Sequence, residues 1–172
     1  MDKDELIKRL LAADADLQLC CKEGEIVRIE IGGGSALILC GVNQWQTPDI
    51  DVCSLQPSVE QIVRKYGINS RMRAFTDILP YNYEDRLQRI DIPTKVLDCY
   101  FLSREDVAVL KLCSDRDKDV VDVNNEDFVR LLDWDLLDKI AKEEFTHIWP
   151  QAPRLQLFYR NYEQFKRTHH RK

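Results

Sequence analysis

The sequence lacks the features that mark membrane proteins, secreted proteins and repeat proteins. None of its apolar runs approaches the roughly 20 residues that a membrane-spanning helix requires. The N-terminus, MDKDELIKRLL, carries acidic residues where a signal peptide is basic, and it has no apolar segment followed by a cleavage site. The chain has no internal repeat and no low-complexity linker. We therefore expect a cytoplasmic globular protein without membrane attachment.

Histidine is scarce, and the cysteines do not follow the spacing of a metal site. The three histidines, His147, His169 and His170, all lie toward the C-terminus. The six cysteines form no Cys-x-x-Cys motif and no Cys/His cluster with zinc spacing. Cys20 and Cys21 are adjacent, and the other four each lie in an apolar stretch, which predicts buried free thiols. Those four are Cys40, Cys53, Cys99 and Cys113.

Charge is distributed unevenly along the 172 residues. The formal net charge is −5, but the segment from Gln151 to Lys172 has six basic residues against one glutamate and is +5, so the remainder is −10. A basic tail on an acidic body favours a polyanion or an acidic partner. The helical spacing of Phe158, Tyr162 and Phe165 favours instead an amphipathic helix packed on the body, and RNA contact stays open as an alternative.

The hydrophobic pattern predicts an α/β (α+β) fold in which a small mixed sheet is flanked by helices. With 44% hydrophobic residues the chain can bury a real core. We expect residues 1–134 to form this core and residues 135–172 to form a helical extension of the same globular unit. Strands are expected at Glu25–Ile31, Asp49–Leu55 and Thr94–Leu102. Helices are expected at Asp2–Ala13, Ser35–Cys40 and Pro57–Tyr66, and one or two short helices between Ser70 and Arg89. Ser103 is expected to open a helix that carries EDVAVLKLCS, and a second helical segment follows through DKDVVDV. The closing helices are expected at Asp127–Trp134, Asp135–Phe145 and Arg154–Thr168.

The stretch GGGSALILCGVNQWQTPDIDV, from Gly32 to Val52, carries the strongest chemical signal. Asp49 and Asp51 alternate along the expected strand, so they point to one face. Two adjacent carboxylates repel each other unless a cation lies between them, and Mg²⁺ accepts such ligands together with substrate phosphates. A glycine-rich turn leaves backbone N–H groups available to phosphate oxygens, and Ser35 adds a hydroxyl. The pattern favours a nucleoside triphosphate held over a metal; a plain strand-to-helix turn is the alternative.

These residues resemble the signature of the polymerase-β-like nucleotidyltransferase superfamily, a Gly-Gly/Ser element followed by Asp-x-Asp on the next strand. LPYNYEDRL, LSREDVAVLKL and RDKDVVDV, between Leu79 and Val123, resemble a bacterial branch of small nucleotidyltransferase-like proteins related to AbiEii-type toxins. The resemblance covers residues 25 to 132. It implies a Mg²⁺- or Mn²⁺-dependent transfer of NMP from an NTP to a tRNA or protein acceptor. It also implies a cognate antitoxin as a possible partner.

The resemblance assigns roles to individual residues. Asp49 and Asp51 would bind the metal, and Lys111 would offset phosphate charge, although a solvated helix lysine is the alternative. Asp98 is the preferred third carboxylate because it alternates with Val96 and Tyr100, and Asp91 and Asp119 are the alternatives. The residues expected to hold the triphosphate are Gly33, Gly34, Ser35 and Thr47. Asp119 and Asp122 match an acidic element of the branch, with helix capping or ion pairing as the alternative.

The sequence departs from the family pattern in two respects. Many relatives have arginines just before the threonine of the Asp-x-Asp strand, where this chain has Gln44 and Gln46. The chain is also shorter than AbiEii-type toxins. A catalytically inactive module of the same fold, acting as a partner or regulatory subunit, is therefore the alternative function. Trp45 in the same turn could stack on a base, with packing on the core as the alternative, and Cys53 is expected to pack because no histidine base is near it in sequence.

Overall fold

The structure is a computed structural model that describes residues 1–42 and 47–170. Gln44 and Gln46, which replace the arginines of many relatives, and Trp45, a possible base-stacking residue, lie outside these ranges. The chain divides into two compact units. The first unit comprises Met1–Ala74 and Leu87–Leu102, and the second comprises Phe75–Arg86 and Ser103–Lys172. The expected boundary near residue 134 stays a prediction.

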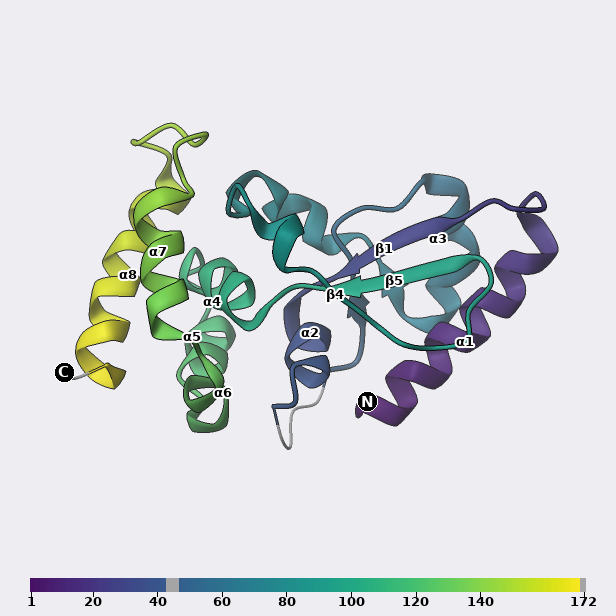
Figure 1. The fold of residues 1–172 in the computed structure, drawn as a ribbon, viewed down its shortest axis with the longest axis horizontal. Helices are drawn as coiled ribbons and strands as arrows, with labels where there is room; N and C mark the ends of the chain where they lie inside the picture. Colours follow the sequence, from purple (N-terminus) through teal and green to yellow (C-terminus); the bar gives the residue numbers. More distant parts are fainter. Residues whose placement is uncertain (43–46, 171–172) are drawn as a thin grey trace. The chain divides into compact units, whose positions relative to one another are not determined.

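The first unit contains the sheet and the helices that cover it (Figure 1). Strands β1 and β5 run parallel, with Ile29 opposite Cys99, and β4 pairs antiparallel with β5. β2 and β3 form a second, parallel sheet of two strands, and an antiparallel bridge from Ile31 to Val52 links the two sheets. The elements are α1 (Lys3–Cys20), β1 (Val27–Ile31), α2 (Gly33–Leu39), β2 (Ile50–Asp51), α3 (Pro57–Val63), η1 (Arg64–Tyr66), β3 (Ile68–Asn69), β4 (Gln88–Arg89) and β5 (Leu97–Phe101). The predicted mixed sheet with flanking helices is confirmed.

Helix α1 begins where the sequence predicts and ends seven residues later than predicted, at Cys20 instead of Ala13. Its N-cap is Asp2, whose side chain accepts the backbone N–H of Glu5. The helix continues because Leu17 extends its buried face and because the buried carboxylate of Asp14 has partners. Asp14 accepts the backbone N–H groups of residues 95, 96 and 97 at 3.1, 2.8 and 2.7 Å, and so holds the start of β5.

Strand β2 is much shorter than the predicted strand Asp49–Leu55, which is wrong in length. A strand persists only where a neighbour supplies a hydrogen-bonding ladder. The partner β3 has two residues and gives way at Arg71 to a 3₁₀ helix, η2 (Arg71–Ile78). Beyond Asp51, Val52 donates to the carbonyl of Asn69 and Cys53 to that of Glu30, and then the pairing ends.

The second unit is helical within its described residues. It contains α4 (Arg104–Leu112), α5 (Asp117–Val123), α6 (Glu126–Leu131), α7 (Trp134–Glu143) and α8 (Pro153–His169), together with the 3₁₀ helix η3 (Tyr83–Arg86). As predicted, α8 is amphipathic and buries Phe158, Tyr162 and Phe165. Two of its basic residues are already paired, Lys166 with Asp138 and Arg154 with Asp77.

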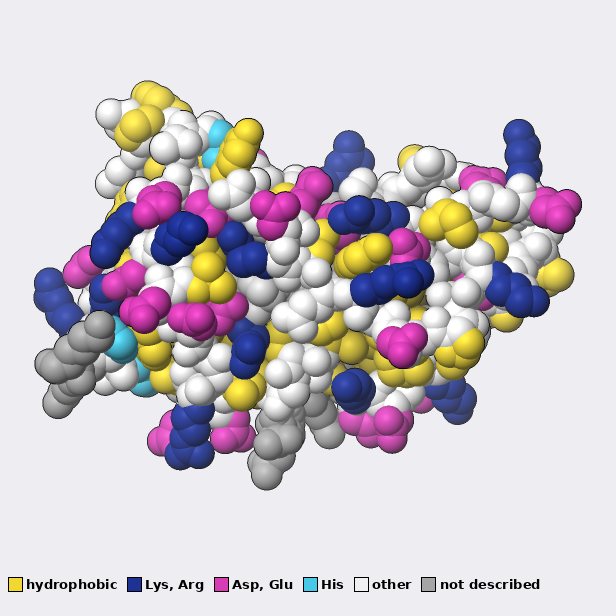
Figure 2. Space-filling view, viewed as in Figure 1, with side chains coloured by type: hydrophobic (Ala, Val, Ile, Leu, Met, Phe, Trp, Pro, Cys, Tyr) yellow, Lys and Arg dark blue, Asp and Glu magenta, His cyan; other side chains and the backbone are white. Residues whose placement is uncertain are grey.

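Opposite charges are interspersed over the face of the molecule shown in Figure 2. RNA contact by the basic tail therefore stays a prediction. None of the helices in the described part of the chain is both long enough and apolar enough to cross a membrane.

The motif LPYNYEDRL has a structural role in the second unit. Its half-buried Arg86 bonds the carboxylates of Asp106 on α4 and Glu144 next to α7, at 2.7 and 2.8 Å. Burial raises the pKa of Asp106, although Arg86 and the Ser103 hydroxyl bond to the ionised form. The Arg86 guanidinium, bonded to two buried carboxylates, joins three segments that are far apart in sequence.

Candidate functional site

The glycine-rich turn lies directly against the carboxylate strand in the first unit. Gly33 has a φ of 56°, in the left-handed region that favours glycine. A Cβ on Gly33 would lie 3.4 Å from Oδ2 of Asp51, and one on Gly32 would lie 2.7 Å from Cε of Met72. The N–H of Gly32 also donates to the carbonyl of Asp51 at 2.9 Å. A side chain at Gly33 would be strained by the left-handed backbone, and one at Gly32 would displace Met72.

Two hydroxyl groups fix the backbone of Asp49. The hydroxyl of the buried Ser35, in the first turns of α2, donates to the Asp49 carbonyl at 2.7 Å. The hydroxyl of Thr47 donates to the same oxygen at 3.3 Å. Both side chains were predicted to contact phosphate, and in this structure they position the Asp-x-Asp strand. Their contact with a triphosphate, and that of Gly34 in the first turn of α2, stays a prediction.

An arginine that the sequence analysis missed lies beside Asp49. Nη1 of Arg71 is 2.7 Å from Oδ2 of Asp49, and the Arg71 side chain is 72% exposed. The residue follows β3 and belongs to no motif that the sequence analysis recognised. Its position becomes visible only because β3 pairs with β2, so that Asn69 lies opposite Asp51.

Strand pairing places two further carboxylates of the first unit, Glu30 and Asp98, on the face of Asp51. The bridge between Ile31 and Val52 places Glu30 opposite Cys53, on the face of Asp51. Asp98 shares that face but lies opposite Arg28, two residues farther along β1. Its carboxylate accepts bonds from Arg89 at 2.8 Å and from the Tyr100 hydroxyl at 3.1 Å.

Glu30 is thus a second carboxylate that sequence reasoning missed, because only strand pairing brings it near the Asp-x-Asp pair. It forms an ion pair with Arg28 at 3.0 Å. Within the described ranges, no group of three or more His, Cys, Asp or Glu residues is arranged to hold a metal ion. The role of Asp98 as the third carboxylate stays a prediction.

Lys111 and Asp119 come together in the second unit. The ammonium group of Lys111 bonds Asp119 at 3.1 Å and also bonds Asp122. The hydroxyl of Ser114 donates to the other oxygen of Asp119 at 2.8 Å. Lys111 is 6% exposed, so the alternative of a solvated lysine is wrong. Its charge is balanced by two carboxylates within the unit.

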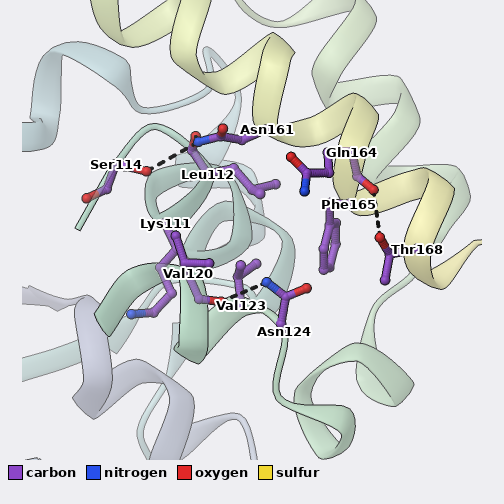
Figure 3. A pocket seen from close by; sticks show the side chains of 10 residues that line it. All are labelled: Lys111, Leu112, Ser114, Val120, Val123, Asn124, Asn161, Gln164, Phe165 and Thr168. Atoms are coloured by element: carbon purple, nitrogen blue, oxygen red, sulfur yellow. Dashed lines mark hydrogen bonds between the residues drawn. The ribbon is translucent and has the colours of Figure 1, made fainter. Parts of the chain in front are cut away.

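A small pocket lies beside this cluster (Figure 3). Its cavity volume is about 130 Å³, whereas ligand pockets usually measure roughly 300–1,000 Å³. Figure 3 shows the ammonium of Lys111 pointing away from Phe165, so the aliphatic part of the lysine forms the wall. The pocket is too small to hold a nucleotide.

The cysteines contribute no catalytic group to these sites. All six are thiols rather than disulfides, and Cys53, Cys99 and Cys113 are buried. Burial raises the pKa of Cys53 to about 12, with a further contribution from the charge of Glu30. The thiolate of Cys53 is therefore negligible at neutral pH, which agrees with the predicted packing role.

Comparison with known proteins adds one match. Residues 8–170 match a family model described as "Nucleotidyltransferase of unknown function (DUF6036)". No curated protein and no solved structure matches the chain. The match includes both the Asp-x-Asp strand and the Lys111 cluster, and the relation to AbiEii-type toxins stays a prediction.

Proposed function

Since the chain belongs to the DUF6036 family of nucleotidyltransferases of unknown function, we propose that it transfers NMP from an NTP to an RNA or protein acceptor. One observation supports this proposal above the others. The backbone of Gly33 lies against the carboxylate of Asp51, on a strand whose neighbouring Asp49 is held by Ser35. This arrangement puts N–H donors and carboxylate oxygens side by side, as a metal-bound triphosphate requires.

The residues fit a divalent cation, either Mg²⁺ or Mn²⁺. Asp49 and Asp51 offer hard oxygen ligands, and Gly33 places no side chain between the turn and Oδ2 of Asp51. Proteins usually supply one or two carboxylate ligands to Mg²⁺, and waters and substrate phosphates supply the others. When bound, the cation would supply charge stabilisation at the phosphoryl group.

In the proposed reaction an oxygen of the acceptor attacks the α-phosphorus of the NTP. The new P–O bond forms as the bond to the β-phosphate oxygen breaks, and pyrophosphate leaves. The proton of the acceptor hydroxyl passes to a carboxylate. Asp98 in the first unit and Asp119 in the second are the proposed bases, and Glu30 is a further candidate from the strand register.

Lys111 is proposed to contribute positive charge during the reaction. Its two carboxylate partners already fix the position of the ammonium group, which is what preorganised electrostatic stabilisation needs. The toxin role with a cognate antitoxin is proposed on the resemblance to AbiEii-type proteins alone.

The test is nucleotide binding measured by calorimetry with each NTP, with and without Mg²⁺. We expect Mg²⁺-dependent binding to the wild type and its loss in Asp49→Asn/Asp51→Asn. Asp4→Asn/Glu23→Gln, which removes two exposed carboxylates of the same unit, is the matched control and should bind normally.

Labelled ATP then identifies the reaction. Label transferred from the α-phosphate indicates nucleotidyl transfer, whereas label transferred from the γ-phosphate indicates a kinase. Absence of binding to every NTP would contradict the proposal and favour the inactive binding module. In that case Asp49→Ala and Asp51→Ala should leave the biological phenotype intact.

A further inference from the structure

The segment after β3 is anchored both to the glycine-rich turn and to the strand that carries the carboxylates. The backbone N–H of Arg71 donates to Oδ1 of Asn69 at 3.0 Å, and Asn69 is the register partner of Asp51. The next residue, Met72, is buried and lies so close to Gly32 that a Cβ there would be 2.7 Å from its Cε. The backbone of Arg71 is therefore fixed with respect to both the turn and the carboxylates.

The side chain of Arg71 is not fixed in the same way. It is 72% exposed, and its ion pair with Asp49 is partly in water. Such an exposed ion pair favours the paired over the unpaired state of the two side chains by at most about fivefold. A divalent cation that binds Asp49 would therefore displace the guanidinium at little cost.

A displaced guanidinium at this position has a new partner in the proposed substrate. Guanidinium groups bind phosphate oxygens through paired, charge-assisted hydrogen bonds, which a single carboxylate oxygen does not match. We propose that Arg71 is a triphosphate-binding residue that exchanges Asp49 for phosphate oxygens when the metal–nucleotide complex binds. Without substrate it offsets the repulsion between Asp49 and Asp51. This inference rests on the proposed function.

The exchange predicts opposite effects of one substitution on two ligands. Arg71→Gln removes a cation that competes for Asp49, so Mn²⁺ alone should bind about 3-fold more tightly. It also removes a phosphate contact, so Mn²⁺ with tripolyphosphate should bind about 10-fold more weakly. The electron paramagnetic resonance signal of free Mn²⁺, titrated with full-length protein, measures both affinities without any need for the acceptor.

Arg73→Gln is the control, because Arg73 is an exposed arginine on the same 3₁₀ helix. It should change neither affinity, and urea unfolding checks that both variants are folded. If Arg71→Gln binds Mn²⁺–tripolyphosphate as tightly as the wild type, Arg71 is not a triphosphate-binding residue, although the proposed metal site is unaffected by this result. Equal weakening of both ligands would also overturn this assignment and would indicate a structural role. A folded wild type that binds neither ligand would overturn the proposed function itself.

Discussion

The hydroxyl of Ser35 donates a hydrogen bond to the backbone carbonyl of Asp49 at 2.7 Å, across 14 residues of sequence. Ser35 belongs to the short helix that follows the glycine-rich turn, and Asp49 precedes strand β2. The bond therefore couples the two elements that the proposed reaction needs. Its donor is fully buried, so water does not readily replace it.

Ser35→Ala should loosen this coupling. We expect a loss of about 1–2 kcal/mol in the free energy of unfolding, because a buried carbonyl loses a partner. Mn²⁺ affinity should fall as well, since Asp49 is held less firmly. Urea unfolding and Mn²⁺ titration measure the two effects. Ser54→Ala, at an exposed serine, is the control. Normal Mn²⁺ affinity in Ser35→Ala would show that the bond supports the fold and not the site.

Asp14→Asn should destabilise the first unit in a pH-dependent way. Burial by itself would raise the pKa of Asp14. The hydrogen bonds from the N–H groups of residues 95–97 outweigh this effect, so the pKa of Asp14 lies below its ordinary value of 3.8. A lowered pKa means that the ionised form stabilises the folded state above pH 3.8 and that this contribution is lost as the pH falls below it.

We therefore expect Asp14→Asn to lose about 2 kcal/mol at pH 7 and to show a flatter stability profile below pH about 4. Urea unfolding at a series of pH values measures both effects. Glu23→Gln, at an exposed carboxylate, should keep the wild-type profile. A profile of Asp14→Asn parallel to that of the wild type would contradict this assignment.

Lys111→Met should destabilise the second unit more than Asp119→Asn. Removing the ammonium leaves two carboxylates without their shared cation, which costs about 3–5 kcal/mol for a buried pair. Asp119→Asn leaves the bond between Lys111 and Asp122, so about 1 kcal/mol is expected. Thermal and urea unfolding compare the variants, with the exposed Lys118→Met as control.

Asp119→Asn also tests catalysis. If Asp119 is the base, Asp119→Asn should abolish NMP transfer in protein that remains folded. Transfer at the wild-type rate would leave Asp119 with only its structural contacts.

The thiols should differ sharply in reactivity. Cys20 is exposed, whereas burial raises the pKa of Cys53 and of Cys99 to about 12. Iodoacetamide at pH about 8 should therefore label Cys20 and spare the two buried thiols, because the thiolate is the nucleophile. Peptide mass spectrometry locates the label, and urea should expose all six cysteines. If Cys53 in the folded protein is labelled as fast as Cys20, Cys53 is not buried as the structure shows.

The sequence by itself determined the local features of this protein. Asp2 and Ser103 begin helices because their side chains accept the N–H three residues on, and this depends only on neighbours in the chain. Gly67 ends a helix because it adopts a left-handed conformation. The alternation of Asp49, Ile50 and Asp51 predicts that Ile50 faces the core, and Ile50 is buried.

Only the tertiary structure decided the partners of the charged groups. Asp14 lies one residue beyond the predicted end of the first helix, and the structure makes it the acceptor for the start of β5, 81 to 83 residues away. Arg71 and Glu30 reach the candidate site through strand pairing, which sequence patterns do not specify. A buried charge is stable only with a partner, and the partner is chosen by how distant segments pack, so no local pattern predicts it.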